Sequence, residues 1–426
     1  MQNKSPNNLS NYYLYYVLML IFFGVIILYN KHEVGNDTSL SDWLINYSGG
    51  FVRRGLIGQI AIEFSNFFSF KLRDSILIFQ VFFFIIYYIF VFLFLRKVIT
   101  NRLIVLTIFS PIFIFYPIAE IEAFGRKEII IFLLVTLYFF SNITNLTTQL
   151  IFKLIVFPLS ILIWEPVIIF YPYLLLVDLA SFQINRFNKN FIYLLSSYLV
   201  TFLIVMFIFL NPFPIENFKT MTNLLANDFG EICYMSCSFV GNQSENSLSE
   251  LINKQVTMMQ PSYFIRYVLI ILIGFFPLFN LLKISKFNNT NLFFFSNFEN
   301  LLFPFAFAFL PSLFLYILMY DWGRIVHISY TFMLLSYFFL LRNNHINIDK
   351  EKLQKNIFIN LSNKKFIFLF IIFCFCWNPK TAMRGDIATN SLYKIVYNSS
   401  KKIFGFEGIR LFQNSPIIKF HEKIFE

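Results

Sequence analysis

Residues 76–95 read Ile-Leu-Ile-Phe-Gln-Val-Phe-Phe-Phe-Ile-Ile-Tyr-Tyr-Ile-Phe-Val-Phe-Leu-Phe-Leu, and this uncharged run decides the fold class. About 20 apolar residues in a helix cross the roughly 30 Å hydrocarbon core of a bilayer. Runs of comparable length recur at 13–28, 191–210, 263–282 and 301–320. The 426 residues are 58% hydrophobic and 13% charged, about half the charged fraction of a soluble domain. The sequence therefore predicts an all-α, polytopic integral membrane helical bundle.

Eleven transmembrane helices are predicted, with the N-terminus in the cytoplasm and the first run as an uncleaved signal anchor. The predicted spans are 12–29, 75–95, 103–118, 127–141, 150–163, 166–180, 191–210, 263–282, 299–320, 324–341 and 365–378. The fifth and sixth are short, so a single helix kinked at Pro166 is the alternative. Splitting them places Lys153 and Arg186 with the many cations of the inner connections, as the positive-inside rule requires. The tail from Asn378 carries eight Lys and Arg and is nevertheless placed outside, because long segments are largely exempt from that rule.

One transmembrane domain is expected over 1–426, with three sizeable outer segments at 30–74, 211–262 and 379–426. The apolar pattern of 59–72 predicts a helix lying in the membrane interface. Cys233 and Cys237 can form a small disulfide if their loop faces the oxidising side. No His lies near either cysteine pair, so no metal site is predicted.

The densest candidate for a binding site runs from Asp42 to Gly58, Asp-Trp-Leu-Ile-Asn-Tyr-Ser-Gly-Gly-Phe-Val-Arg-Arg-Gly-Leu-Ile-Gly. Four glycines within ten residues allow the backbone to turn and to approach a ligand closely. The adjacent Arg53 and Arg54 suit phosphate, because a guanidinium matches phosphate oxygens with two parallel bonds. The pattern predicts a phosphate or pyrophosphate cradle at the membrane surface. The alternative is a tight turn whose arginines reach lipid headgroups.

Three further polar segments fall at predicted outer ends of spans. The first, 120–128, holds Glu120, Glu122, Arg126, Lys127 and Glu128. It is either a site that positions an acceptor hydroxyl or a metal, or an ordinary polar helix start. The second is Glu165 between Trp164 and Pro166, where an acid beside a broken helix suggests a cavity lining or a solvated turn. The third, Asp321-Trp-Gly-Arg324-Ile-Val-His327, places His327 on the helix face of Arg324. Asp321 and Arg324 can alternatively pair with each other and hold the hairpin.

The sequence lacks Asp-x-Asp, Walker, His-Glu-x-x-His and Gly-x-Ser-x-Gly motifs. Their absence argues against a nucleotide-sugar enzyme of the inner face, an ATPase, a zinc protease and an esterase.

The Trp-x-x-Asn-Tyr-x-Gly-Gly-Phe-Val-Arg-Arg-Gly segment and the Asp-Trp-Gly-Arg hairpin resemble membrane proteins of bacterial surface-polysaccharide clusters. The layout also resembles O-antigen (oligosaccharide repeat-unit) polymerases and GT-C glycosyltransferases. The resemblance implies a GT-C-like bundle in the bacterial cytoplasmic (inner) membrane, a polyprenyl-linked sugar donor and chemistry on the outer face. It also implies an essential acid in the first outer loop, which maps to Asp42.

We therefore expect an enzyme, a membrane glycosyltransferase or repeat-unit polymerase that passes sugar from a polyprenyl (pyro)phosphate to a glycan acceptor. Asp42 is the expected base, with Glu122 and Glu165 in reserve. Phosphate would be held by Arg53, Arg54 and Arg324, with Arg126 and His327 as further candidates. No cofactor and no nucleic acid are expected, a divalent cation is compatible with the site, and membrane lipid is a partner. Sugar, linkage and oligomeric state stay open.

Two other classes remain. A transporter or flippase for a lipid-linked glycan or an anion would carry polar groups near the membrane midplane and inverted repeats. A non-catalytic scaffold of an envelope assembly would use the polar loop and basic tail to bind partners.

Overall fold

The computed structural model describes residues 6–34, 37–141, 146–182, 189–237, 240–241, 248–288 and 298–384. Almost all of the regular structure is helical, as the composition predicts. The bounds of the α-helices are α1 Pro6–His32, α2 Thr38–Trp43, α3 Gly55–Phe68, α4 Leu72–Leu95, α5 Arg102–Ile108, α6 Tyr116–Ala119, α7 Glu128–Ser141, α8 Leu146–Ile163, α9 Tyr171–Ser181, α10 Lys189–Leu210, α11 Ile215–Phe229, α13 Leu248–Thr257, α14 Pro261–Gly274, α15 Phe276–Ile284, α16 Leu302–Phe309, α17 Leu313–Leu318, α18 Trp322–Arg342, α19 Lys350–Gln354, α20 Ile357–Asn360 and α21 Asn363–Phe375. Short 3-10 turns are η1 Ile121–Ala123, η2 Glu165–Phe170 and η3 Leu310–Ser312. The two strands, β1 Ser285–Phe287 and β2 Ile346–Ile348, pair antiparallel with Lys286 opposite Asn347.

Five helices are long and apolar enough to cross a membrane, namely α1 (from Leu9), α4, α8, α10 and α18, and α14 with α15 makes a sixth if the pair is one span bent by 54°. These agree with six of the eleven predicted spans, so the chain has the helices of a membrane protein. The other five predicted spans are short or interrupted. Helix α5 ends at Ile108, before Pro111, and α16, η3 and α17 together make an apolar helix, Leu302–Leu318, that is shorter than the five long ones. The eleven-span topology therefore stays a prediction.

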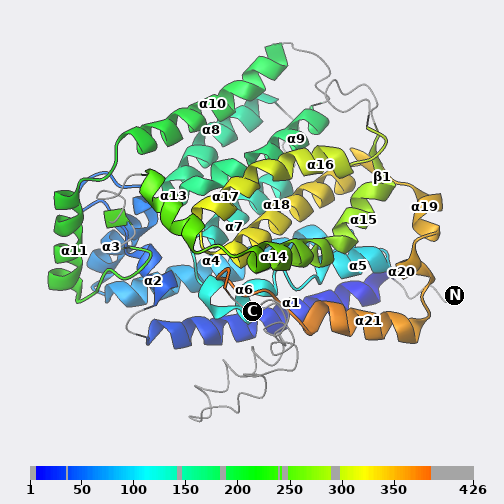
Figure 1. Ribbon diagram of the computed structural model, residues 1–426, viewed down its shortest axis with the longest axis horizontal. Coiled ribbons are helices and arrows are strands. Elements are labelled where there is room, and N and C mark those ends of the chain that lie inside the picture. The colour runs from blue at the N-terminus through cyan, green and yellow to red at the C-terminus, as the bar shows by residue number, and fades with distance from the viewer. Residues whose placement is uncertain are drawn as a thin grey trace, which may run out of the picture.

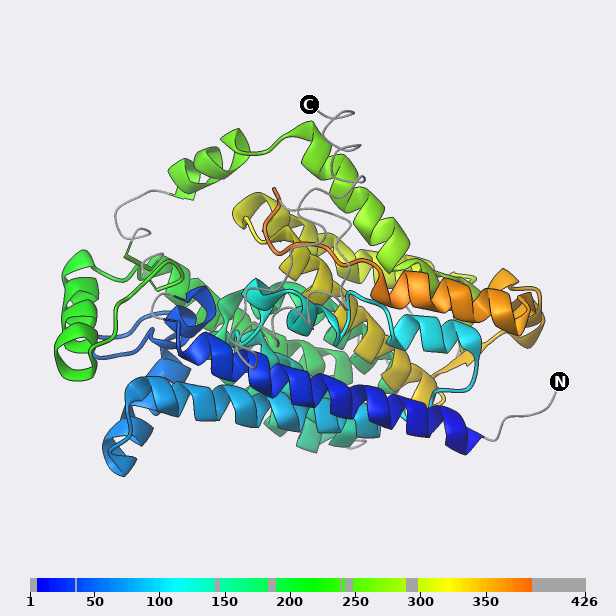
Figure 2. The ribbon, with the colours of Figure 1, turned by 90° about the horizontal axis from the view of Figure 1, so that it is seen from below.

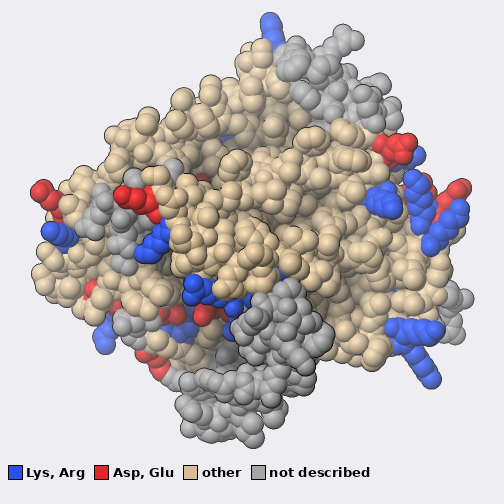
Figure 3. Space-filling model, in the orientation of Figure 1, with Lys and Arg blue, Asp and Glu red and all other residues tan. Residues whose placement is uncertain are grey.

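The helices pack around α18, which lies at the centre of the bundle (Figure 1). In the 18-residue apolar stretch of α18, 94% is buried, whereas the corresponding stretches of α4 and α10 are buried to only 33% and 28%. The outer helices therefore present most of their apolar surface to the surroundings, as lipid-facing helices do. Charged side chains on the face shown in Figure 3 gather toward its two ends, and much of the surface between them is uncharged.

The chain reverses direction between α8 and α9. Lys153 of α8 forms an ion pair with Asp178 of α9, so the two helices lie against each other as a hairpin and not as one kinked helix. The split into two elements is confirmed. The placement of Lys153 among the inner-connection charges was wrong, because its side chain lies inside α8 with no exposed surface. A buried lysine with a carboxylate partner carries no information about loop orientation.

Helix α3 is the helix predicted at 59–72, but it begins and ends four residues earlier. Ile60, Phe67 and Phe68 are exposed, as an interfacial helix requires, while Ile62 packs inward. Helices α1 and α4 lie side by side and lead to this segment (Figure 2).

The tail that was placed outside is described only as far as residue 384. The amide of Gly323 donates to the Thr381 carbonyl, and the amide of Met383 donates to the Tyr320 carbonyl. The start of the tail thus lies beside the α17–α18 turn, and its placement outside the membrane stays a prediction.

Candidate functional site

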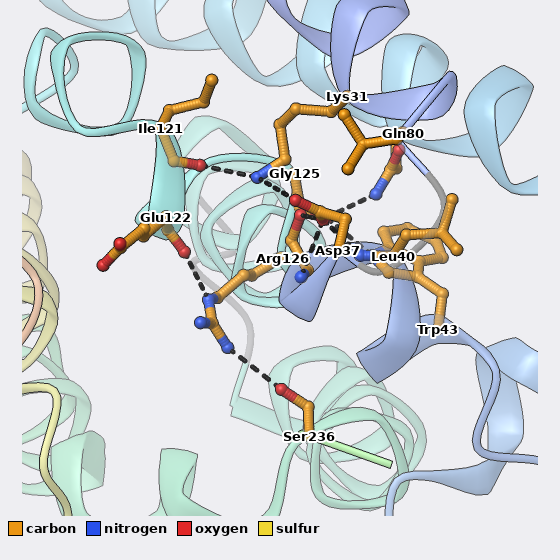
Figure 4. A network of polar contacts seen from close by, with 12 residues as sticks. Lys31, Asp37, Leu40, Trp43, Gln80, Ile121, Glu122, Gly125, Arg126 and Ser236 are labelled. Atoms are coloured by element: carbon orange, nitrogen blue, oxygen red, sulfur yellow. Dashed lines mark hydrogen bonds and ion pairs between the residues drawn. The ribbon is translucent and has the colours of Figure 1, made fainter. Parts of the chain in front are cut away.

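Residues 30–74, predicted as the first outer segment, fold into the bundle through α2. Asp37 caps this helix by accepting from the amides of Ser39 and Leu40, and this cap fixes where the helix begins. Asp42, in its last turn, is 3% exposed, and its Oδ1 has no hydrogen-bond partner among the described residues. The neighbouring Trp43 donates from Nε1 to the Gly125 carbonyl at 2.7 Å (Figure 4). Helix α2 is therefore held against residues 124–127, between η1 and α7, which we call the second outer turn because the sequence predicts them on the outer side.

Arg53 and Arg54 turn inward and share one carboxylate. Arg54 donates to Glu165 from Nε at 2.7 Å and from Nη2 at 2.8 Å, and Arg53 donates from Nη1 at 3.1 Å. The left-handed backbone of Arg54 (φ 62°), just before α3, is the turn from which its side chain points into the bundle. All three side chains are largely buried. The two arginines thus do not extend toward lipid headgroups.

These pairings alter the protonation of the groups involved. Burial alone would raise the pKa of Glu165, but the charges of Arg54 and Arg53 lower it to about 2. Burial lowers the pKa of Arg53 to about 10, opposed by the charge of Glu165. Glu165 is thus an anion at every physiological pH, which suits an ion-pair partner better than a proton acceptor.

Lys127 and Arg324 bring two more cations into the same region. Lys127, fully buried, donates from Nζ to the Arg54 carbonyl at 2.6 Å. Arg324 Nη1 lies 2.9 Å from Asp321 Oδ2, and its Nε lies 3.3 Å from Glu128 Oε1. Asp42 interacts electrostatically with both of these cations and with the arginine pair.

We call this group the buried charge cluster. It joins ionisable residues from four separate stretches of the chain, with four cations facing three carboxylates. Its members are Asp42, Arg53, Arg54, Lys127, Glu128, Glu165 and Arg324.

The remaining predicted residues lie at the edge of the cluster or apart from it. Arg126 donates from Nε to the Glu122 carbonyl at 2.9 Å, while the Glu122 carboxylate points away from Arg126 and the residue is exposed (Figure 4). Asp321 connects Arg126 to the cluster, because its Oδ2 lies 3.8 Å from Arg126 Nη2 and also pairs with Arg324. His327 is buried between the rings of Tyr116 and Phe132.

The imidazole of His327 is oriented by the backbone. Its Nδ1 lies 2.9 Å from the Ile112 carbonyl oxygen. A carbonyl only accepts, so Nδ1 carries the proton in this contact.

The glycines of the 42–58 segment make room for protein. A Cβ at Gly58 would lie 1.9 Å from the Ile45 carbonyl oxygen, and one at Gly49 would lie 2.0 Å from the Asn217 carbonyl oxygen. At Gly55 the nearest atoms belong to the Tyr47 ring. At these three glycines, the close neighbour of the backbone is therefore another segment of the protein, whereas the sequence predicts a ligand there.

The Cys233–Cys237 disulfide is present and belongs to a segment, 231–237, that is fastened next to Asp42. Ser41 Oγ bonds the backbone of Tyr234 in both directions, accepting from its amide at 2.9 Å and donating to its carbonyl. Arg73 holds Glu231 with two bonds, of 2.9 and 2.7 Å. This cross-linked segment therefore braces α2 from the outside.

Sequence reasoning identified five members of the cluster and assigned no role to Lys127 and Glu128. The sequence did contain an indication that these two residues are buried. They directly precede an apolar run, and residues at such a position become buried when the run packs inward. Among the described residues, no group of three or more His, Cys, Asp or Glu is placed to hold a metal ion.

The arrangement gathers four cations and a carboxylate with an unpartnered oxygen in one buried region, a combination that can attract an anion and accept a proton. Comparison of the chain with models of protein families, with curated proteins and with solved structures finds no match.

Proposed function

We propose that this protein is a membrane glycosyltransferase or repeat-unit polymerase. It transfers a sugar or oligosaccharide from a polyprenyl (pyro)phosphate to a glycan acceptor, on the outer face of the bacterial inner membrane, in surface-polysaccharide synthesis. The observation that carries the proposal is the buried charge cluster. Ionisable groups inside an apolar bundle are costly and are retained for function.

The cations of the cluster suit the leaving phosphate. Arg53 and Arg54 both hydrogen-bond to Glu165, so two guanidinium charges meet one shared carboxylate there. Glu165 keeps Arg53 and Arg54 in a fixed orientation before the donor binds. Charge that develops on the phosphate oxygen during transfer would then meet preorganised donors, and such sites need no reorganisation at the moment of reaction.

A carboxylate of the cluster would take the proton of the acceptor hydroxyl. The resemblance to GT-C enzymes and polymerases maps this role to Asp42, whose Oδ1 is buried and without a hydrogen-bond partner among the described residues. Loss of a general base costs about 10²- to 10⁴-fold in rate.

The test is the length of surface glycan, read on a gel, in a deletion strain that carries the wild type or a variant at equal protein level. Asp42→Asn, and Arg53→Ala with Arg54→Ala, should each reduce the glycan to a single repeat unit if the protein is a polymerase. A missing side-branch sugar at normal length would instead indicate a single-sugar transferase. The matched controls are Glu63→Gln, an exposed carboxylate of α3, and Arg96→Ala, an exposed arginine at the far end of α4. An unchanged glycan in the deletion strain itself would refute the proposal.

One observation favours the second candidate, a transporter or flippase for a lipid-linked glycan or an anion. Lys153 and Asp178 form a fully buried ion pair within α8 and α9, away from the cluster, and transporters carry charges at such depth. Glycan transfer by the purified protein in detergent, where no membrane separates two compartments, would exclude transport as its only activity.

A further inference from the structure

A small cavity lies next to the buried charge cluster. Its volume is about 30 Å³, enough for roughly two water molecules. Its polar lining comes from α4, the second outer turn, α7 and α18, and includes Gln80, Tyr87, Arg126, Glu128, Arg324 and His327. Gln80 and Trp43 both donate to the Gly125 carbonyl, which holds the turn on one side of the cavity in place (Figure 4).

Three polar atoms of this lining have no hydrogen-bond partner among the described residues, although all are buried. They are Glu128 Oε2, Arg324 Nε and the Tyr87 hydroxyl. Arg324 Nε lies within ion-pair distance of Glu128 Oε1, at 3.3 Å, but it is not aligned as a hydrogen bond. Buried polar groups are nearly always paired with protein, water or ligand, so a cavity lined by residues that carry such atoms is suited to a polar group of a ligand.

The unpaired atoms define the chemistry of that group. Arg324 Nε can only donate, and a carboxylate oxygen such as Glu128 Oε2 accepts, so a group that pairs with both must accept from one and donate to the other. A hydroxyl group does both. Asp42, by contrast, has an unpartnered oxygen but does not line the cavity.

We propose that this cavity seats the attacking hydroxyl of the glycan acceptor and that Glu128, not Asp42, takes its proton. The inference rests on the proposed transferase function. In the step, the acceptor oxygen forms a bond to the donor sugar's C1 while the bond from C1 to the phosphate oxygen breaks. The electron pair of that bond leaves on the lipid (pyro)phosphate, and the hydroxyl proton moves to Glu128 Oε2. Asp42 then serves as a positioning residue for the surrounding cations.

The first measurement compares Glu128→Gln with the wild type and with Glu351→Gln, an exposed carboxylate at the far end of the bundle. Purified proteins are added to membranes of the deletion strain, and the rate of glycan extension is read on a gel. Glu128→Gln keeps the shape of the side chain but removes one of the two anions beside Arg324, so its melting temperature should fall somewhat. Assayed well below that temperature, the folded variant should lose about 10²- to 10⁴-fold in rate. A wild-type rate for Glu128→Gln would overturn the inference, whereas inactivity of the wild type would refute the proposed function instead.

Chemical rescue separates the base from a structural ion pair. Glu128→Ala enlarges the cavity, so added formate can occupy the place of the lost carboxylate and restore the rate by about tenfold or more. Asp42→Ala should gain nothing from formate. Rescue of Asp42→Ala in place of Glu128→Ala, or rescue of neither, would overturn the assignment.

Discussion

Lys153 of α8 and Asp178 of α9 form an ion pair in which neither side chain has any exposed surface. Tyr138, Tyr198 and Gln149 also donate to the Asp178 carboxylate, so α7, α8, α9 and α10 converge on one acid. The aromatic rings of Tyr138, Phe157 and Tyr198 surround the Lys153 ammonium. This network therefore holds four helices together around the buried Lys153–Asp178 ion pair.

Breaking this pair on one side should be more damaging than removing both charges. Lys153→Met or Asp178→Asn alone leaves a charge without its partner, at an expected cost of about 3–5 kcal/mol. Lys153→Met combined with Asp178→Leu should recover much of that loss. The measurement is thermal unfolding in detergent, with Lys350→Met, an exposed lysine at the start of α19, as the unchanged control. A double variant as unstable as the worse single variant would contradict this account.

The stability of the protein should fall in acid because of Glu165. Its pKa is about 2 in the folded protein, held there against burial by Arg54 and Arg53, and about 4.5 as a free side chain. As the pH falls, the unfolded chain therefore takes up this proton first. The contribution of Glu165 is complete above about pH 4.5 and is lost as the pH falls toward 2.

Melting temperatures measured from pH 6 to pH 3 should thus drop more steeply for the wild type than for Glu165→Gln. The variant starts lower, because it leaves two buried arginines without their anion. Equal slopes for the two proteins would show that Glu165 is not the titrating group.

Gly58→Ala should separate α3 from the segment that carries Asp42. The new methyl would meet the backbone oxygens of Ile45 at 1.9 Å and of Trp43 at 2.6 Å, and neither can move without shifting α2. We expect a lower melting temperature and shorter surface glycan. Asn66→Ala, at an exposed position of the same helix, should change neither. Wild-type behaviour of Gly58→Ala would mean that this contact is not needed.

The Cys233–Cys237 bond should protect both thiols in cells. In a Cys374→Ser, Cys376→Ser background, a maleimide-polymer reagent should shift the protein on a gel only after reduction. Such protection would place segment 231–237 on the oxidising side of the membrane. Labelling without reductant would contradict that placement. Loss of the bond should cost about 2 kcal/mol or less, because the loop it closes is short.

The long uninterrupted runs could be predicted from composition alone. Helices such as α4 and α10 contain an unbroken apolar stretch of the required length, and both agree with the predicted bounds within about three residues. The predicted spans 103–118 and 299–320 are also apolar, yet α5 ends at Ile108, before Pro111, and a 3-10 turn at Pro311 separates α16 from α17. Hydropathy reports how favourably a side chain is transferred from water to an apolar environment, and it contains no information about where a helix ends. The end of α5 and the 3-10 turn η3 were therefore not predicted.

The site could be predicted residue by residue but not as pairs. Arg54 and Glu165 were each chosen for their chemistry, and their contact joins positions 111 residues apart. Lys153 illustrates the opposite error, since a lysine near a span end was interpreted as a loop charge. Only the partner contributed by α9 shows that it is buried. The pairing of charges depends on tertiary packing, which no local pattern contains.

The burial of α18 has a consequence for how the chain is made. This helix begins at Trp322 of a 426-residue chain, and 94% of its 18-residue apolar stretch is buried inside the protein. Helix α18 is therefore synthesised after most of the helices that surround it. Helices α7 and α9, which contact α18 in the folded protein, are therefore made before the helix that covers their inward faces. The helices therefore cannot complete their packing in the order of synthesis. A chain that ends before residue 342 would lack part of α18, against which the other helices pack.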